Sequence, residues 1–275
     1  MSIGSFKAKA VLEDLEISSH TDLQYLTEIC MARGVFVRED NIDGAEARLT
    51  ISRGTGDTKA VIVVKPNDSY ETRTRFSVAH ELGHFEIHKD IQSTISCNDR
   101  ALNEWFGKQD HQKRETDANE FASELLLPAK FIAPDFNASK PSLNLIEELA
   151  DKYQCSFLAV ARRLIELSQD ACALVFYRGD QILYHILSKR FKEQNYWIAP
   201  GKLDSQTFAF DAAMERKFGR GMSMVDAAAW IDTSDMKEWQ AKKLKDKNVL
   251  EQARYFSRLD LGVSLVQLTP TLIWN

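Results

Sequence analysis

The chain has 275 residues, of which 44% are apolar and 27% are charged, and its formal net charge is −5. A chain of this length accommodates one large domain or two ordinary ones, each with its own core. No segment approaches the roughly 18 uninterrupted apolar residues of a membrane span, and the mixed, charged N-terminal sequence lacks the apolar core of a signal peptide. These properties exclude fibrous, repeat and membrane-spanning classes and leave a globular protein.

The four cysteines are scattered along the sequence and form no CxxC pair. This spacing argues against a disulfide framework or a cysteine-rich zinc site, and it is typical of proteins in a reducing compartment. We therefore expect a cytoplasmic protein. The cysteines are Cys30, Cys97, Cys155 and Cys172.

The first part of the chain alternates helical and β-rich patterns. Residues 5–33 have apolar positions at helical spacing and predict two helices that end at Gly34. The β-rich segments ARLTI (47–51) and AVIVVKP (60–66) flank a glycine-containing stretch and predict a hairpin. The polar sequence KDIQSTISCNDR (89–100) predicts a loop.

Helical patterns dominate as far as residue 169. The segment ETDANEFASELLLP (115–128) predicts a helix that Pro128 ends, and AKFIAPDF (129–136) predicts a short helix with a break at Pro134. Residues 142–167 predict two helices that resemble a helix-turn-helix in outline. We doubt that this pair binds DNA, because its second helix presents few basic residues, and we expect it to pack on the neighbouring core.

The pattern changes near residue 170. The sequence CALVFYRGDQILYHIL (172–187) predicts a hairpin about a Gly-Asp turn, and GVSLVQLTPTLIW (262–274) predicts a closing strand. Residues 239–256 mix charged and apolar positions in a way that favours a helix. The change in pattern predicts two domains, 1–169 with the helix pair 142–167, and 170–275.

The segment RFSVAHELGHFEIH (75–88) holds three of the six histidines, at a spacing of four. His80 and His84 share one face of a helix, so both imidazoles can bind one ion, and the pattern HELGH matches HExxH. Zinc accepts two imidazoles and a third protein ligand and leaves one position for water. Glu81 follows the first ligand and can take a proton from that water, so we expect Glu81 to be the catalytic base.

Helix geometry also bears on the choice of the third metal ligand. His88 lies about 12 Å along the helix axis from His80, too far to share its ion, so we expect it to support a ligand or to pack. The third ligand then comes from the next helix, which offers Glu115, Glu120 and Glu124, with His111 a weaker candidate. Glu115 and Asn119 lie four residues apart, so Glu115 can bind the metal while Asn119 fixes a ligand histidine.

The two segments together resemble the ImmA/IrrE family of zinc metallopeptidases, whose pattern is close to RFTLAHELGHLLLH followed by ExxANxFAAELLMP. The resemblance spans roughly residues 20–168. It implies Zn²⁺ bound by His80, His84 and Glu115, with Glu81 as the base. It also implies an α+β fold, with a zincin-like, mainly helical peptidase domain and a small β-sheet. The substrate it implies is a helix-turn-helix repressor.

Cys97 follows His84 by 13 residues, in a segment that returns toward Glu115. Its thiolate can fill the fourth zinc position and silence the enzyme. The layout also resembles the CapP type found beside CBASS anti-phage operons, which implies such a cysteine switch. That likeness implies single-stranded DNA as the signal and a small repressor, CapH, as the substrate.

Residues 170–275 show no motif for chemistry, and the resemblance implies a mixed α/β, PAS- or GAF-like sensor domain. Tyr184, Tyr196 and Trp197 lie near Lys189, Arg190 and Lys192 in the sequence and could form a surface for single-stranded nucleic acid. We favour the alternative, in which these residues belong to an ordinary core and a solvated helix.

A second hypothesis is a DNA-binding transcriptional regulator with a structural zinc site and no proteolysis. The sequence leaves the oligomeric state open.

Overall fold

The structure is a computed structural model that describes residues 2–52, 59–66, 71–89, 94–97, 112–216, 221–234, 236 and 238–273. Two compact units divide the chain: Met1–Ile132 with Leu149–Ala159, and Ala133–Glu148 with Val160–Asn275. Three helices contribute residues to both units, namely α6 (Ala129–Asn137), α7 (Leu143–Tyr153) and α8 (Phe157–Leu167). The domain boundary near residue 170 stays a prediction.

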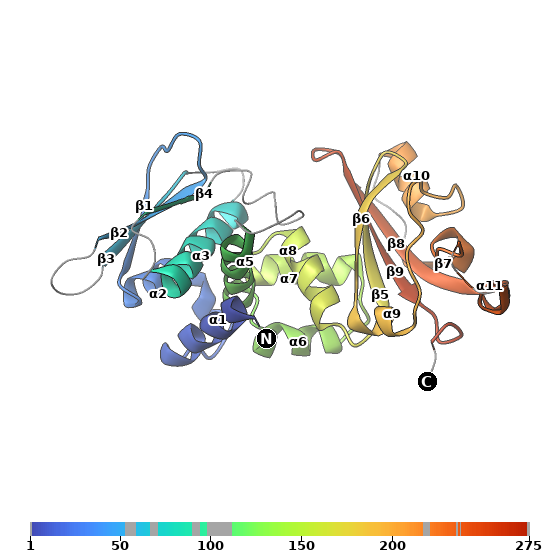
Figure 1. The fold of residues 1–275 in the computed structure, drawn as a ribbon, viewed down its shortest axis with the longest axis horizontal. Helices are drawn as coiled ribbons and strands as arrows, with labels where there is room; N and C mark the ends of the chain where they lie inside the picture. Colours follow the sequence, from blue (N-terminus) through green and yellow to red (C-terminus); the bar gives the residue numbers. More distant parts are fainter. Residues whose placement is uncertain are drawn as a thin grey trace. The chain divides into compact units, whose positions relative to one another are not determined.

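Among the described residues of the first unit, four strands form a mixed sheet in the order β1-β3-β2-β4 (Figure 1). Strands β2 and β3 pair antiparallel, which confirms the predicted hairpin. β1 pairs parallel with β3 and was missed by the sequence analysis. The strands are β1 (Val35–Glu39), β2 (Ala47–Ser52), β3 (Lys59–Val64) and β4 (Thr94–Cys97).

Strand β4 corrects the prediction of a loop over residues 89–100. Its backbone pairs antiparallel with β2, and Cys97 lies opposite Ala47. The polar composition of the segment predicted a loop because backbone pairing with a strand more than forty residues earlier leaves no local signal.

Helices pack against this sheet and against each other (Figure 1). α3 contacts β2 and β3, and α5 contacts both α1 and α3. The contact is apolar: Ala79 and Leu82 of α3, with Phe121 and Leu125 of α5, are fully buried. Two helices within residues 5–33 are confirmed. The helices are α1 (Ile3–Asp14), η1 (Asp22–Gln24), α2 (Leu26–Ala32), α3 (Glu71–His88) and α5 (Gln112–Leu126).

Helix α6 does not break at Pro134, contrary to the prediction. Pro134 lies inside α6, and its carbonyl accepts a hydrogen bond from the amide of Ala138 at 3.0 Å. Proline removes one backbone donor from a helix, and this short helix continues across that loss. The pair of helices predicted over residues 142–167 is confirmed as α7 and α8.

In the described part of the second unit, five strands form an antiparallel sheet in the order β6-β5-β9-β8-β7. The β5–β6 hairpin is confirmed, and Gly179 in its turn has a φ of 52°. The elements are β5 (Cys172–Arg178), β6 (Gln181–Leu187), α9 (Lys189–Glu193), α10 (Phe208–Glu215), β7 (Ser223–Asp226), η3 (Ala227–Ala229), α11 (Glu238–Leu244), β8 (Asn248–Phe256) and β9 (Leu261–Leu268).

Strand β8 corrects the helix predicted over residues 239–256, of which α11 is helical and Asn248–Phe256 is a strand. Two charged residues of this segment, Glu251 and Arg254, are buried in the sheet. Glu251 accepts hydrogen bonds from Trp230 Nε1 (3.0 Å), Ser264 Oγ (3.0 Å) and the amides of Phe208 (3.1 Å) and Ala209 (2.7 Å). These partners stabilise a buried carboxylate within a strand.

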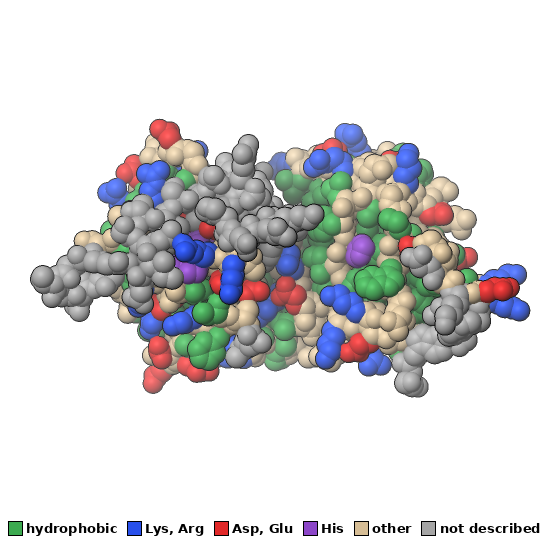
Figure 2. All heavy atoms as spheres, viewed as in Figure 1, with side chains coloured by type: hydrophobic (Ala, Val, Ile, Leu, Met, Phe, Trp, Pro, Cys, Tyr) green, Lys and Arg blue, Asp and Glu red, His purple; other side chains and the backbone are tan. Residues whose placement is uncertain are grey.

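Side chains on the opposite face of β8 contact α7. Gln252 Oε1 accepts a hydrogen bond from the Leu143 amide at 2.7 Å, and Arg254 donates to Glu147 at 3.0 Å. The face drawn in Figure 2 exposes apolar side chains among polar ones around β6, where Leu183 is 48% exposed. The second unit therefore covers most of its sheet but leaves part of an edge strand in solvent.

Within the described ranges, no helix combines the length and the apolar character that crossing a membrane requires.

Candidate metal centre

The HELGH segment lies in the middle of α3, between the sheet and α5. His80 and Glu81 are fully buried, and His84 is 1% exposed. Polar side chains that are buried to this extent need partners inside the protein. The i, i+4 spacing of the two histidines brings their imidazoles to one face of α3, as the sequence predicts.

Three potential ligand atoms converge between α3 and α5. His80 Nε2 lies 3.1 Å from His84 Nε2. Glu115, in the first turn of α5, places Oε2 at 3.3 Å from His80 Nε2 and Oε1 at 3.4 Å from His84 Nε2. Among the described residues, these three form the group that could hold a metal ion.

The separations between these atoms fit a tetrahedral ion. Zinc bonds of about 2.0–2.1 Å place neighbouring ligand atoms about 3.3–3.4 Å apart. Two imidazoles and one carboxylate are also a donor set that zinc accepts while it keeps a fourth position open. The residues present therefore fit a zinc ion in both geometry and chemistry.

Each of the two histidines has a polar partner at Nδ1, the ring nitrogen that does not face the other ligands. His80 Nδ1 lies 2.9 Å from Asn119 Oδ1, so Nδ1 carries the proton that it donates, and Nε2 presents its lone pair to the site. His84 Nδ1 lies 3.3 Å from His88 Nδ1, and the same tautomer makes His84 the donor and His88 the acceptor. Asn119 and His88 thus lie where the sequence placed them, each against one of the two histidines.

Burial and hydrogen bonding hold these groups in their metal-binding protonation states. Burial lowers the pKa of His84, and burial with the nearby His84 charge lowers the pKa of His88 to about 4. Burial alone would raise the pKa of Glu115, but its interactions with the imidazoles of His80 and His84 outweigh burial and keep that pKa below its ordinary value. Near neutral pH His84 is therefore a neutral imidazole and Glu115 is a carboxylate, as metal binding requires.

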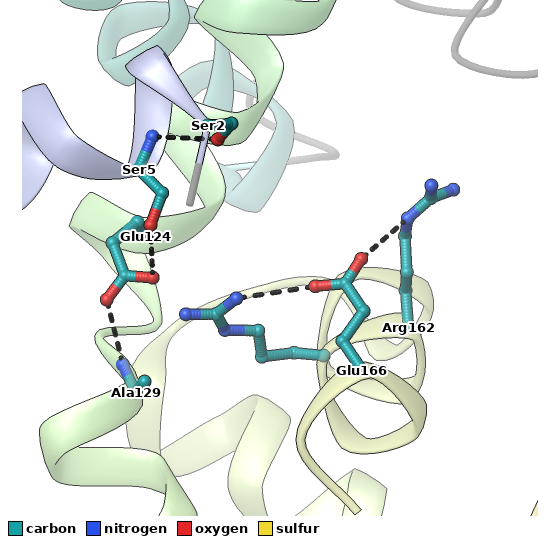
Figure 3. A network of polar contacts seen from close by, with 7 residues as sticks. Ser2, Ser5, Glu124, Ala129, Arg162 and Glu166 are labelled. Carbon is teal, nitrogen blue, oxygen red and sulfur yellow. Dashed lines mark hydrogen bonds and ion pairs between the residues drawn. The ribbon is translucent and has the colours of Figure 1, made fainter. Parts of the chain in front are cut away.

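The other acidic candidates on α5 are not brought to the histidines. Glu124 accepts hydrogen bonds from Ser5 Oγ at 3.2 Å and from the Ala129 amide at 3.1 Å, so it links α1 and α5 to the start of α6 (Figure 3). Glu120 does not belong to the group formed by the described ligand atoms. His111 and the side chain of Cys97 lie outside the described residues.

An ion pair that sequence reasoning missed ties α3 to the end of α2. Arg33, at the end of α2, donates to Glu86 through Nε at 2.7 Å and Nη2 at 3.1 Å. The signal was present in the sequence, since an acidic residue within the buried run VAHELGHFE needs a cationic partner. The partner was not readable, because it lies 53 residues earlier in the chain.

Comparison with known proteins adds two findings. Residues 30–165 match the peptidase family described as the IrrE N-terminal-like domain. A solved structure described as a Mycobacterium tuberculosis transcriptional regulator has a similar fold, with a TM-score of 0.56 and 16% identity over 96% of this chain and 87% of that chain. Comparison with functionally curated proteins gave no match. The matched domain contains His80, His84 and Glu115, and through this domain the chain belongs to the ImmA/IrrE family of metallopeptidase-like proteins.

Proposed function

We propose that this chain is a zinc-dependent endopeptidase that cleaves a helix-turn-helix transcriptional repressor. The observation that carries the proposal is the convergence of His80, His84 and Glu115 at the separations of a tetrahedral zinc site. Membership of a peptidase family supports the activity. Cleavage of the repressor would derepress stress or anti-phage genes.

Each residue of the site has a distinct role in this proposal. His80, His84 and Glu115 bind the ion, and Asn119 and His88 hold the two imidazoles in their binding tautomers. When bound, zinc polarises the scissile carbonyl and acidifies the attacking water. Glu81 takes the proton of that water and passes it to the leaving amine. Glu81 is fully buried and adjoins the ligand His80 in α3.

Regulation is the second part of the proposal. Cys97 silences the enzyme as a fourth zinc ligand, and a signal such as single-stranded DNA releases it. Its backbone belongs to β4, which pairs with β2 of the same sheet that α3 packs against, and this placement supports the idea. The resemblance to the CapP type suggests that the substrate is a CapH-like repressor. We place the protein in the cytoplasm, where its thiols stay reduced.

Residues 170–275 are the sensor in this proposal, with a PAS- or GAF-like fold. An antiparallel sheet that has helices packed on it supports that assignment. Of the aromatic residues considered for nucleic-acid stacking, Trp197 is 56% exposed, whereas Tyr196 is buried and Tyr184 stacks on Phe176 at 4.4 Å. Trp197 with the exposed Lys189, Arg190 and Lys192 remains the candidate surface.

The decisive experiment compares Glu81→Gln with Glu120→Gln, a matched exchange on α5 outside the metal group. Each variant is co-expressed with the small repressor encoded nearest to its gene, with and without single-stranded DNA. Glu81→Gln should retain zinc, measured by elemental analysis, and abolish cleavage, while Glu120→Gln should cleave like the wild type. Undiminished cleavage by Glu81→Gln would contradict the proposed base.

A second candidate is a DNA-binding transcriptional regulator with a structural zinc ion. The similar fold of a protein described as a transcriptional regulator favours it. A structural zinc site is closed by four protein ligands and needs no base. Wild-type protein that binds duplex DNA in a gel-shift assay, but never cleaves a repressor, would support this alternative.

A further inference from the structure

Gly83, in the HELGH motif of α3, lies directly against Phe121 of α5. A Cβ atom added at Gly83 would lie 3.0 Å from Phe121 Cδ1 and 3.1 Å from both Phe121 Cβ and Cγ. Ordinary carbon–carbon contacts are about 3.5–4.0 Å. Phe121 is fully buried, so its ring has no solvent-filled space into which it can turn.

Helix α5 also packs closely against α1. A Cβ atom at Gly4 of α1 would overlap the carbonyl oxygen of Asp117 and would lie 2.9 Å from the amide nitrogen of Phe121. The Ser5–Glu124 hydrogen bond adds a polar tie between the same two helices (Figure 3). The backbone of α5 therefore packs directly against α1.

We propose that Gly83 is a positioning residue that sets the spacing between α3 and α5, so that Glu115 meets His80 and His84 at zinc-binding separations. The inference rests on the proposed function, because it concerns the same three ligands. Glu115 precedes Phe121 by six residues, about 9 Å along α5, so a shift at Phe121 moves Glu115 with the helix. A methyl group at Gly83 forces Phe121, or α5 with it, to shift by a few tenths of an ångström. Functional sites tolerate only about 0.5 Å.

Helix stability does not explain a glycine at this position. Glycine is the poorest helix former apart from proline, and alanine is the best. Position 83 lies inside an 18-residue helix, where alanine would strengthen α3 if the helix stood alone. The contact with Phe121 supplies the missing reason, and it predicts that alanine harms the metal site rather than the helix.

The test measures zinc affinity by competition with a chelator, using the full chain at a temperature where circular dichroism shows each variant to be folded. Gly83→Ala should raise the zinc dissociation constant on the order of tenfold or more, within the range of other ligand-orienting residues. Gly4→Ala is the matched control, because it crowds the backbone of α5 from α1 rather than from the helix that carries the two histidines. It should lower the thermal midpoint but change zinc affinity less than threefold.

A double-mutant cycle with Phe121→Ala separates positioning from general destabilisation. Phe121→Ala should itself weaken zinc binding, and Gly83→Ala in that background should add little further loss. A folded Gly83→Ala variant with wild-type affinity, or equal losses in Gly83→Ala and Gly4→Ala, would overturn the inference. If Gly83→Ala does not fold, wild-type affinity in Phe121→Ala would overturn it. If the wild type did not bind zinc, that result would instead contradict the proposed function itself.

Discussion

Arg33 and Glu86 form a two-point ion pair that ties the end of α2 to the last turns of α3. Nε donates to Oε1 at 2.7 Å and Nη2 donates to Oε2 at 3.1 Å. The Glu86 side chain is 5% exposed, and hydrogen bonding to Glu86 raises the pKa of Arg33. Since α3 carries both histidines, this pair ties the metal-bearing helix to α2.

Glu86→Gln should destabilise the fold by about 1–3 kcal/mol, because the partly buried Arg33 guanidinium loses its counter-charge and one of its acceptors. The control is Asp14→Ala, which removes the outer partner of Arg33 at 3.2 Å, where the Asp14 side chain is 58% exposed. That exposed pair should contribute less than about 1 kcal/mol. Urea denaturation of both variants measures the difference, and equal losses would contradict the importance of the buried pair.

Asn119→Leu should weaken zinc binding about 10–100-fold, because His80 loses the acceptor that fixes its tautomer. Asn119→Asp is the matched variant, since it keeps an oxygen in place to accept the proton of Nδ1. It should bind zinc about as tightly as the wild type. Chelator competition gives both affinities, and indifference of Asn119→Leu would show that the hydrogen bond does not orient the ligand.

Thiol labelling should isolate Cys97 from the other cysteines. Burial raises the pKa of Cys30 and Cys155 to about 12 and that of Cys172 to about 11. At pH 8 the ionised, reactive fraction of each of these three thiols is therefore about one part in a thousand or less. Their labelling rates should rise about tenfold per pH unit. If Cys97 binds zinc, it should label quickly only after the metal is removed.

The control for this labelling is Cys97→Ser, which should show no fast thiol in native protein, with or without chelator. Stopped-flow measurement with a coloured disulfide reagent follows the reaction. A fast thiol in the zinc-loaded wild type would speak against Cys97 as a ligand.

The sequence predicted the parts of the fold whose signal is local. The helices around His80 and Glu115, the β2–β3 and β5–β6 hairpins and the α7–α8 pair follow from periodicity and turn residues. The spacing of HExxH and of Glu115 with Asn119 likewise follows from helix geometry alone, and the structure brings these groups together.

Elements that depend on distant partners escaped prediction. β1 is only five residues long and acquires its partner β3 from beyond the next strand. β8 contains Glu251 and Arg254, which resemble the solvated side of a helix until their buried partners are known. Tertiary contacts decide such segments against their local preference.

Within the site, sequence spacing identified which residues can meet but not what holds them at the right distance. The Arg33–Glu86 pair and the contact between Gly83 and Phe121 both join residues from different helices. In the sequence, neither residue of each pair indicates which residue is its partner.

The Glu251 carboxylate of β8 has a consequence for how the second unit opens. Its four donors come from the start of α10, from Trp230 and from Ser264 on the adjacent strand, so none can be released without leaving a buried charge less well solvated. The amides of Phe208 and Ala209 should therefore exchange hydrogen at rates similar to those of the amides that pair β8 with β9. A molecule that displaced any one of these donors would therefore change the hydrogen bonding of the other three to Glu251.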